Sequence, residues 1–241
     1  MAKDDVRFNN NSFHSGLRPI TEETHFSNAI RFIAILLNIS FHINVLIITV
    51  SLCSTFWRIG LGKTAMHACF CTLGYILLVA EGINLRYSYN PLFWDFDLLT
   101  NVLIHTIMVT SGGLIAVAGT VKMYYSATIH FSSFHGQIGA ASLMIILLNI
   151  VSGACYTSSR VVLDDLRLLH DFLGIVTFAL GIYSQMTGYA SGFFRRNFDR
   201  IRLYRALTLF VFITGLFHPF SALLDAVEKS ILSWSPTLLN Q

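Results

Sequence analysis

Four histidines are the residues of this chain best suited to chemistry, because each falls inside a strongly apolar stretch. They are His67, His105, His135 and His170. An ionisable side chain inside a membrane is costly and usually marks a functional site. Neutral imidazole is a common ligand of iron, copper and zinc. One such histidine could equally bond to a neighbouring helix, but four of them on four consecutive apolar stretches favour metal ligation.

Six apolar segments must position these histidines, and each reaches the roughly 20 residues that a helix needs to cross a bilayer. Their predicted bounds are Ala29–Leu52, Thr64–Leu85, Leu98–Lys122, Phe131–Tyr156, Leu166–Tyr189 and Tyr204–Leu224. Backbone in lipid must bond to itself, so each segment is expected to be helical. Because the connections are short, neighbours should pack antiparallel. The sequence therefore predicts an all-α membrane protein with six transmembrane helices in an up-and-down bundle.

The composition points to a lipid bilayer as the surroundings of this chain. Hydrophobic residues make up 54% of it and charged residues only 12%, about half the charged share of a typical soluble protein. The mean hydropathy is +0.61. A net charge of +3 is too small to suggest nucleic acid as a partner. We expect one transmembrane domain over residues 29–224, an N-terminal tail over 1–28 and a C-terminal tail over 225–241.

The order of the helices predicts how the histidines pair. Successive helices run in opposite directions, so histidines near successive helix starts alternate between the two membrane faces. His67 and His135 then fall on the side opposite the termini, and His105 and His170 on the side of the termini. Two facing imidazoles can ligate one haem iron inside a helical bundle. We expect two b-type haems per chain; a haem-free transporter or receptor with intramembrane histidines is the alternative.

Charged groups gather near the His105 and His170 end. They can meet an anionic substrate or the haem propionates, and the candidate substrate-binding residues are Arg86, Tyr87, Arg160 and Arg167. Glu81, near the end of the second segment, is a candidate partner of a ligand imidazole or a proton carrier. His42 and His218 have no histidine at an equivalent position, so we interpret both as structural.

Short motifs around the histidines are typical of a known family. They are Met66-His67, Ala80-Glu81-Gly82, the lone His105, Phe134-His135-Gly136-Gln137 and Leu169-His170-Asp171-Phe172-Leu173-Gly174. In these motifs and their order, residues 29–224 resemble the cytochrome b561 family. The chain is similar to its small six-helix branch, cytochrome b561 domain-containing protein 2. The resemblance implies two haems b, with His67 and His135 on the non-cytoplasmic one and His105 and His170 on the cytoplasmic one.

The resemblance also implies an activity. Family members pass electrons from cytosolic ascorbate to monodehydroascorbate or ferric chelates on the other side, so we expect a transmembrane ascorbate-dependent reductase. It also implies a homodimer in an endomembrane vesicle or the plasma membrane. Relatives place a histidine near His130, which we expect to bind the acceptor. The chain departs from the pattern at Met66, where many relatives have tryptophan, and at Arg86 and Tyr87, near which better-known members use lysines.

Orientation does not follow from charge. Of the 16 lysines and arginines, eight fall on each predicted side, which leaves the positive-inside rule without a preference. The basic loop Arg195–Arg205 by itself favours termini outside the cytoplasm, whereas the resemblance implies cytoplasmic termini. Asn10, in an Asn-Asn-Ser glycosylation sequon, would report a lumenal N-terminus if it carried a glycan.

Overall fold

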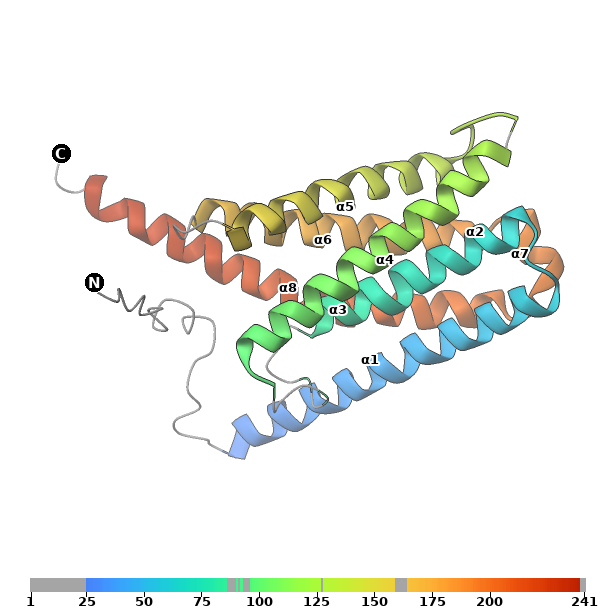
Figure 1. Cartoon of the computed structure of the whole chain (residues 1–241). Coiled ribbons are helices and arrows are strands. Elements are labelled where there is room, and N and C mark those ends of the chain that lie inside the picture. The colour runs from blue at the N-terminus through green and yellow to red at the C-terminus, as the bar shows by residue number, and fades with distance from the viewer. Residues whose placement is uncertain are drawn as a thin grey trace, which may run out of the picture.

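The computed structural model describes residues 25–85, 90, 92, 96–126, 128–158 and 164–238, and its regular structure there is entirely helical. Figure 1 shows the helices side by side in one bundle. Their bounds are α1 His25–Arg58, α2 Lys63–Cys71, η2 Thr72–Val79, α3 Ala80–Asn84, α4 Leu98–Ser126, α5 Phe134–Ser158, α6 Asp164–Gly188, α7 Gly192–Asn197 and α8 Ile201–Leu238.

Six of these helical stretches are long and apolar enough to span a membrane, as the sequence predicts. The second span is made of α2, η2 and α3 together. Two helices are much longer than expected, and α4 continues four residues past Lys122 to Ser126. α1 continues past Leu52 to Arg58, and α8 runs for 38 residues to Leu238, so the predicted C-terminal tail begins inside α8. The predicted N-terminal tail lies outside the described residues except for the first residues of α1.

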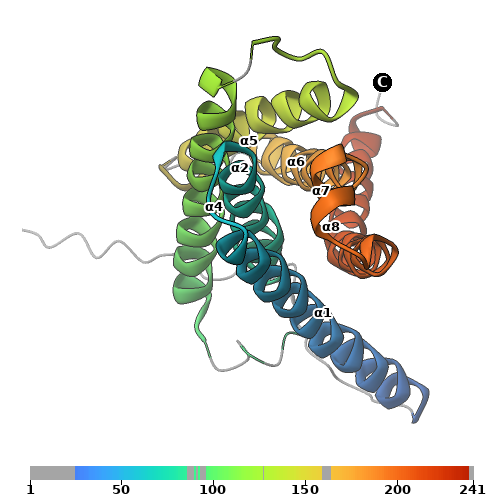
Figure 2. The ribbon, with the colours of Figure 1, turned by 90° about the vertical axis from the view of Figure 1, so that its right-hand side faces the viewer.

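The spans alternate in direction, which confirms the up-and-down arrangement (Figure 1). We call the loop end the end of the bundle where α1, α4 and α6 finish and α2, α5 and α8 begin. The terminal end is the opposite one, where α1, α4 and α6 begin and α3, α5 and α8 finish. Viewed from the loop end, the second span lies between α1, α4 and α6, all of which it contacts (Figure 2). Both ends of the described chain belong to the terminal end, as an even number of spans requires.

Two glycines allow the second span and α4 to cross closely. A Cβ atom at Gly112 would lie 2.7 Å from the Gly74 carbonyl oxygen, and one at Gly74 would lie 2.5 Å from the Gly112 carbonyl oxygen. Only glycine fits such an approach of two backbones. Gly74 lies in η2, a π-helical stretch, and stretches of this kind are frequent at functional sites in helices.

The side chains divide between a packed interior and an apolar outer surface. Phe41, Ile76 and Phe178 are almost fully buried between α1, η2 and α6, whereas Leu99 and Phe217 expose 76% and 69% of their surface. An outer surface this rich in exposed large hydrophobic residues suits lipid rather than water. At the loop end, the rings of Phe194 in α7 and Phe198 stack with their centres 4.8 Å apart, and both side chains are buried. The neighbouring arginines of the basic loop are exposed.

Candidate functional site: two facing pairs of histidines

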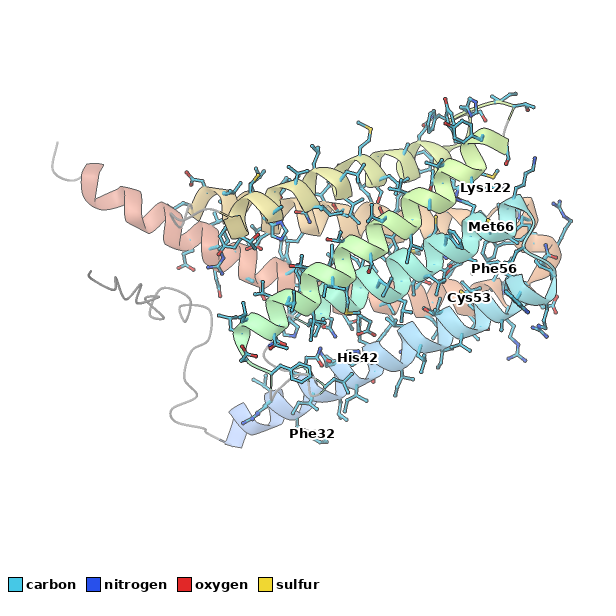
Figure 3. All side chains as sticks on the ribbon, in the orientation of Figure 1. Phe32, His42, Cys53, Phe56, Met66 and Lys122 are labelled. Carbon is cyan, nitrogen blue, oxygen red and sulfur yellow. The ribbon has the colours of Figure 1, made fainter. Side chains whose placement is uncertain are left out.

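The first histidine pair lies at the loop end. His67 is in the first turns of α2 and His135 is the second residue of α5. Their ring centres are 6.1 Å apart and the ring planes cross at 72°. Figure 3 labels Met66, the neighbour of His67, at this end of the bundle. The structure therefore brings together the two histidines that the sequence places opposite the termini.

The second pair lies at the terminal end. His105 is in the third turn of α4, and His170 is in the second turn of α6. Their ring centres are 6.3 Å apart and the planes cross at 83°. The alternation of helix directions thus predicts both pairings correctly, although the two members of each pair come from helices that are not consecutive.

Backbone carbonyls of a neighbouring helix hold three of the four imidazoles. His105 donates from Nδ1 to the Gly82 carbonyl of α3 at 2.7 Å. His67 packs against Gly119 of α4, where an added Cβ atom would lie 3.3 Å from the His67 carbonyl oxygen, and its Nδ1 lies 3.6 Å from Cys71 Sγ. The second span and α4 therefore form an antiparallel hairpin in which each partner contacts the other's histidine.

The α5–α6 hairpin repeats this arrangement. His135 donates from Nδ1 to the Ser184 carbonyl of α6 at 2.9 Å, and His170 donates to the Asn149 carbonyl of α5 at 3.2 Å. A neutral imidazole that donates from Nδ1 carries its lone pair on Nε2. Metal-ligating histidines are typically oriented in this way by a carbonyl on the other ring nitrogen.

The spacing of each pair fits two imidazoles on one iron. Two metal–nitrogen bonds of about 2 Å each, and roughly 1 Å from each nitrogen to its ring centre, give a separation near 6 Å. Each pair supplies two nitrogen ligands, which suits an iron whose porphyrin supplies the others. The residues present therefore fit haem as the cofactor.

Glycines keep room beside two of the four rings. A Cβ atom at Gly153 would lie 2.8 Å from His170 Cε1, and one at Gly188 would lie 3.2 Å from His135 Cε1. Each glycine follows, by four residues, the residue whose carbonyl holds that histidine. A side chain at either position would push the imidazole out of place.

The predicted substrate residues are only partly within the described chain. Arg86, Tyr87 and Arg160 lie outside it. Arg167 lies at the terminal end, three residues before His170. Its Nε atom is 3.8 Å from Asp171 Oδ2, and its side chain is 39% exposed.

His130 lies at the loop end, after α4, as the sequence order requires. Its ring stacks on Tyr124 with centres 4.0 Å apart and planes 19° apart. The side chain is exposed. His130 is thus an exposed, aromatic-backed imidazole on the same end of the bundle as His67 and His135.

Glu81 bonds to a histidine, and that histidine is His42 of α1. Glu81 Oε2 and His42 Nδ1 are 2.6 Å apart. The sequence predicts a structural role for His42. Its contact with Glu81 is not visible in the sequence, because 39 residues separate the two. Glu81 still adjoins the paired histidines, since the next residue, Gly82, holds His105.

The comparisons with known proteins agree with this arrangement. The model of the eukaryotic cytochrome b561 family matches residues 66–195, which is more than half of the chain and includes all four paired histidines. No curated protein and no solved structure gives a significant match. Proteins of the matched family bind haem b and carry electrons across membranes. With its six spans and its two facing histidine pairs, this chain belongs to the eukaryotic cytochrome b561 family.

Proposed function

We propose that the chain carries electrons across its membrane through two haems b, one ligated by His105 and His170 and the other by His67 and His135. The observation that carries this proposal is the presence of two facing imidazole pairs, at 6.3 and 6.1 Å, at opposite ends of one bundle. The family match supports it, and favours it over the haem-free transporter or receptor.

The protein fixes the position of each haem and controls which donor and acceptor molecules can reach it. When bound, each haem supplies a reversible one-electron couple. Two imidazoles per iron leave no open position, which favours electron transfer over oxygen binding. His170 bonds to Asn149, which lies 14 residues after His135 on α5. At about 1.5 Å per residue, the two sites are therefore about 20 Å apart along the helix. The carbonyl bonds to the imidazoles hold the ligands rigidly, so little rearrangement accompanies each electron transfer.

We further propose cytosolic ascorbate as the donor at the terminal end and monodehydroascorbate or a ferric chelate as the acceptor at the loop end. Arg167 and, by sequence position, Arg86 and Arg160 supply positive charge for an anionic donor at the terminal end, and Tyr87 supplies a hydroxyl that can donate a hydrogen bond. At the loop end, the exposed His130 on Tyr124 offers the acceptor a coordinating nitrogen. We assign the chain to the cytochrome b561 domain-containing protein 2 branch and propose a homodimer in an endomembrane vesicle or the plasma membrane.

Single alanine variants of Arg86, Arg160 and Arg167 test the donor site. A guanidinium offers a forked pair of charge-assisted bonds to an anion. Losing one such contact should cost about 1.5–3 kcal/mol. The half-saturating ascorbate concentration should then rise roughly tenfold to a hundredfold in at least one variant. Stopped-flow reduction of the purified protein by ascorbate measures this.

The same experiment with dithionite separates donor binding from damage to the haem sites. Dithionite needs no specific site, so it should reduce the variants at the wild-type rate. Arg200→Ala, which removes an exposed arginine at the loop end, is the matched control and should leave ascorbate reduction unchanged. Equal slowing with both reductants would show that the arginines hold propionates or the fold. No slowing in any variant would place the donor elsewhere.

A further inference from the structure

His42 and Glu81 form a partly buried acid–base pair to which the proposed electron path assigns no role. The contact joins α1 to α3, with Nδ1 and Oε2 2.6 Å apart. The side chains keep 13% and 15% of their surface exposed, so both groups are largely removed from solvent but not sealed from it. Figure 3 labels His42 near the middle of α1. An ionisable pair inside a span is costly to keep and points to function.

The hydrogen bonds of Asn90 indicate how many protons this pair holds. Its amide orientation is fixed twice, because Leu92 N–H donates to Oδ1 at 3.1 Å and Nδ2 donates to the Asn84 carbonyl at 3.2 Å. His42 Nε2, 3.2 Å from Asn90 Oδ1, must therefore be the donor. One proton then remains to be shared between His42 Nδ1 and Glu81 Oε2. With that proton on His42 Nδ1, the pair is an imidazolium and a carboxylate, and the pair as a whole is neutral.

The pair lies one peptide away from the terminal-end histidines. Glu81 precedes Gly82, whose carbonyl accepts the Nδ1 hydrogen bond of His105 at 2.7 Å. About one turn nearer the helix end, Asn84 and Asn38 exchange amide hydrogen bonds of 3.2 and 3.4 Å, which ties α3 to α1. Charge that arrives between His105 and His170 therefore acts on a rigidly held acid–base pair across a poorly screened interior.

We propose that the His42–Glu81 pair binds one proton when an electron reaches the site between His105 and His170. This rests on the proposed function. The donor supplies the electron, water at the terminal end supplies the proton, and an O–H bond forms on Glu81 while His42 stays an imidazolium. The pair changes from neutral to singly positive, which offsets the added electron. Reoxidation releases the proton, so the exchange is reversible and the local net charge stays constant.

Other titratable groups at the terminal end must be separated from this pair. Among the residues whose side chains the structure describes, those on α1 and on the helices that pack against α1 and α3 are Arg31, Asp97 at the start of α4, His105, His218, Asp225 and Glu228. Glu228 is exposed near the end of α8 and offers the same chemical change as Glu81 when substituted by glutamine. Glu228→Gln is therefore the matched control, since it removes a terminal-end carboxylate that does not take part in the His42 contact.

Redox titrations at a series of pH values test the proposal. The haem signal that His105→Ala removes identifies the terminal-end site. In the wild type its midpoint potential should fall with rising pH, approaching about 59 mV for each tenfold change in proton concentration. In Glu81→Gln the imidazole of His42 can still gain a proton, whereas His42→Gln/Glu81→Gln lacks both proton-binding groups, so in this double variant the dependence should vanish. Glu228→Gln should behave as wild type. A wild-type potential independent of pH, or an unchanged slope in the double variant, would overturn the proposal.

Infrared difference spectroscopy of the wild type gives an independent readout that does not depend on the variant folding. Electrochemical reduction of the full chain should convert a carboxylate signal into a carboxylic acid carbonyl signal. Absence of such a signal in the wild type would contradict the proposed proton uptake, even if the variants fail to bind haem. Two haems with pH-independent potentials would overturn this proposal alone. A wild-type protein that binds no haem would overturn the proposed function as well.

Discussion

At the scale of single residues, the proposed electron transfer depends on the four paired histidines. Their apolar surroundings and alternating positions predict both which residues pair and at which end, and the structure agrees on all four. The groups that orient them could not be predicted in the same way. Ser184 and Asn149 act through their backbone carbonyls, so their side chains give no signal in the sequence.

Substituting the histidines one at a time tests the pairing as haem ligation. Ligands of one iron act as a unit, so His67→Ala should resemble His135→Ala, and His105→Ala should resemble His170→Ala. Each change should remove one haem signal from the redox difference spectrum and spare most of the other. His218→Ala, on α8 and outside both pairs, is the control. Spectra that group His67 with His105 would show that the pairs are not the ligand sets.

At the scale of helices, the apolar segments predict all six spans, and the differences have local causes. α1 continues past Leu52 because the residues up to Arg58 contain no helix-breaking residue and bury Phe56. It finishes where Gly60 takes a φ of 86°, in the left-handed region that favours glycine.

The π-helical stretch η2 explains why the sequence does not predict His42 as the partner of Glu81. Glu81 follows His67 by 14 residues, nearly four turns of about 3.6 residues, so an unbroken α-helix would place both on one face. Each residue of a π stretch turns the helix less, because its hydrogen bonds span five residues. Thr72–Val79 is such a stretch, and beyond it Glu81 meets His42 on α1.

Gly112→Ala tests the close crossing between α4 and η2. The added methyl would lie 2.7 Å from the Gly74 carbonyl oxygen and 2.8 Å from Leu78 Cβ, and the backbone there cannot yield without moving α4. Overpacking of this kind costs about 1–3 kcal/mol. We expect a lower thermal unfolding temperature and weaker haem retention at both ends, because the second span supplies His67 at the loop end and α4 supplies His105 at the terminal end. Gly62→Ala, which would meet no atom within 4 Å, should change neither. Equal unfolding temperatures for both variants would contradict the close packing of α4 against η2.

At the scale of the whole molecule, the two ends of the bundle have different chemistry. Both ends of the described chain lie at one end of the bundle, as predicted, but the balance of positive charge gives no orientation. We place the termini in the cytoplasm, against the preference of the basic loop. An epitope at either terminus should then be digested by protease added to vesicles whose cytoplasmic face is outward. Asn10 should carry no glycan. A glycan on Asn10 would reverse the topology and exchange the donor and acceptor ends.

We propose that each chain holds two haems b, one in each histidine pair. Pyridine haemochrome analysis of the purified full chain, set against protein mass, measures this number. Four ligands in two pairs with ring centres 6.1 and 6.3 Å apart predict two haems b per chain. A ratio of one in fully loaded protein, or a protein without haem, would contradict the account.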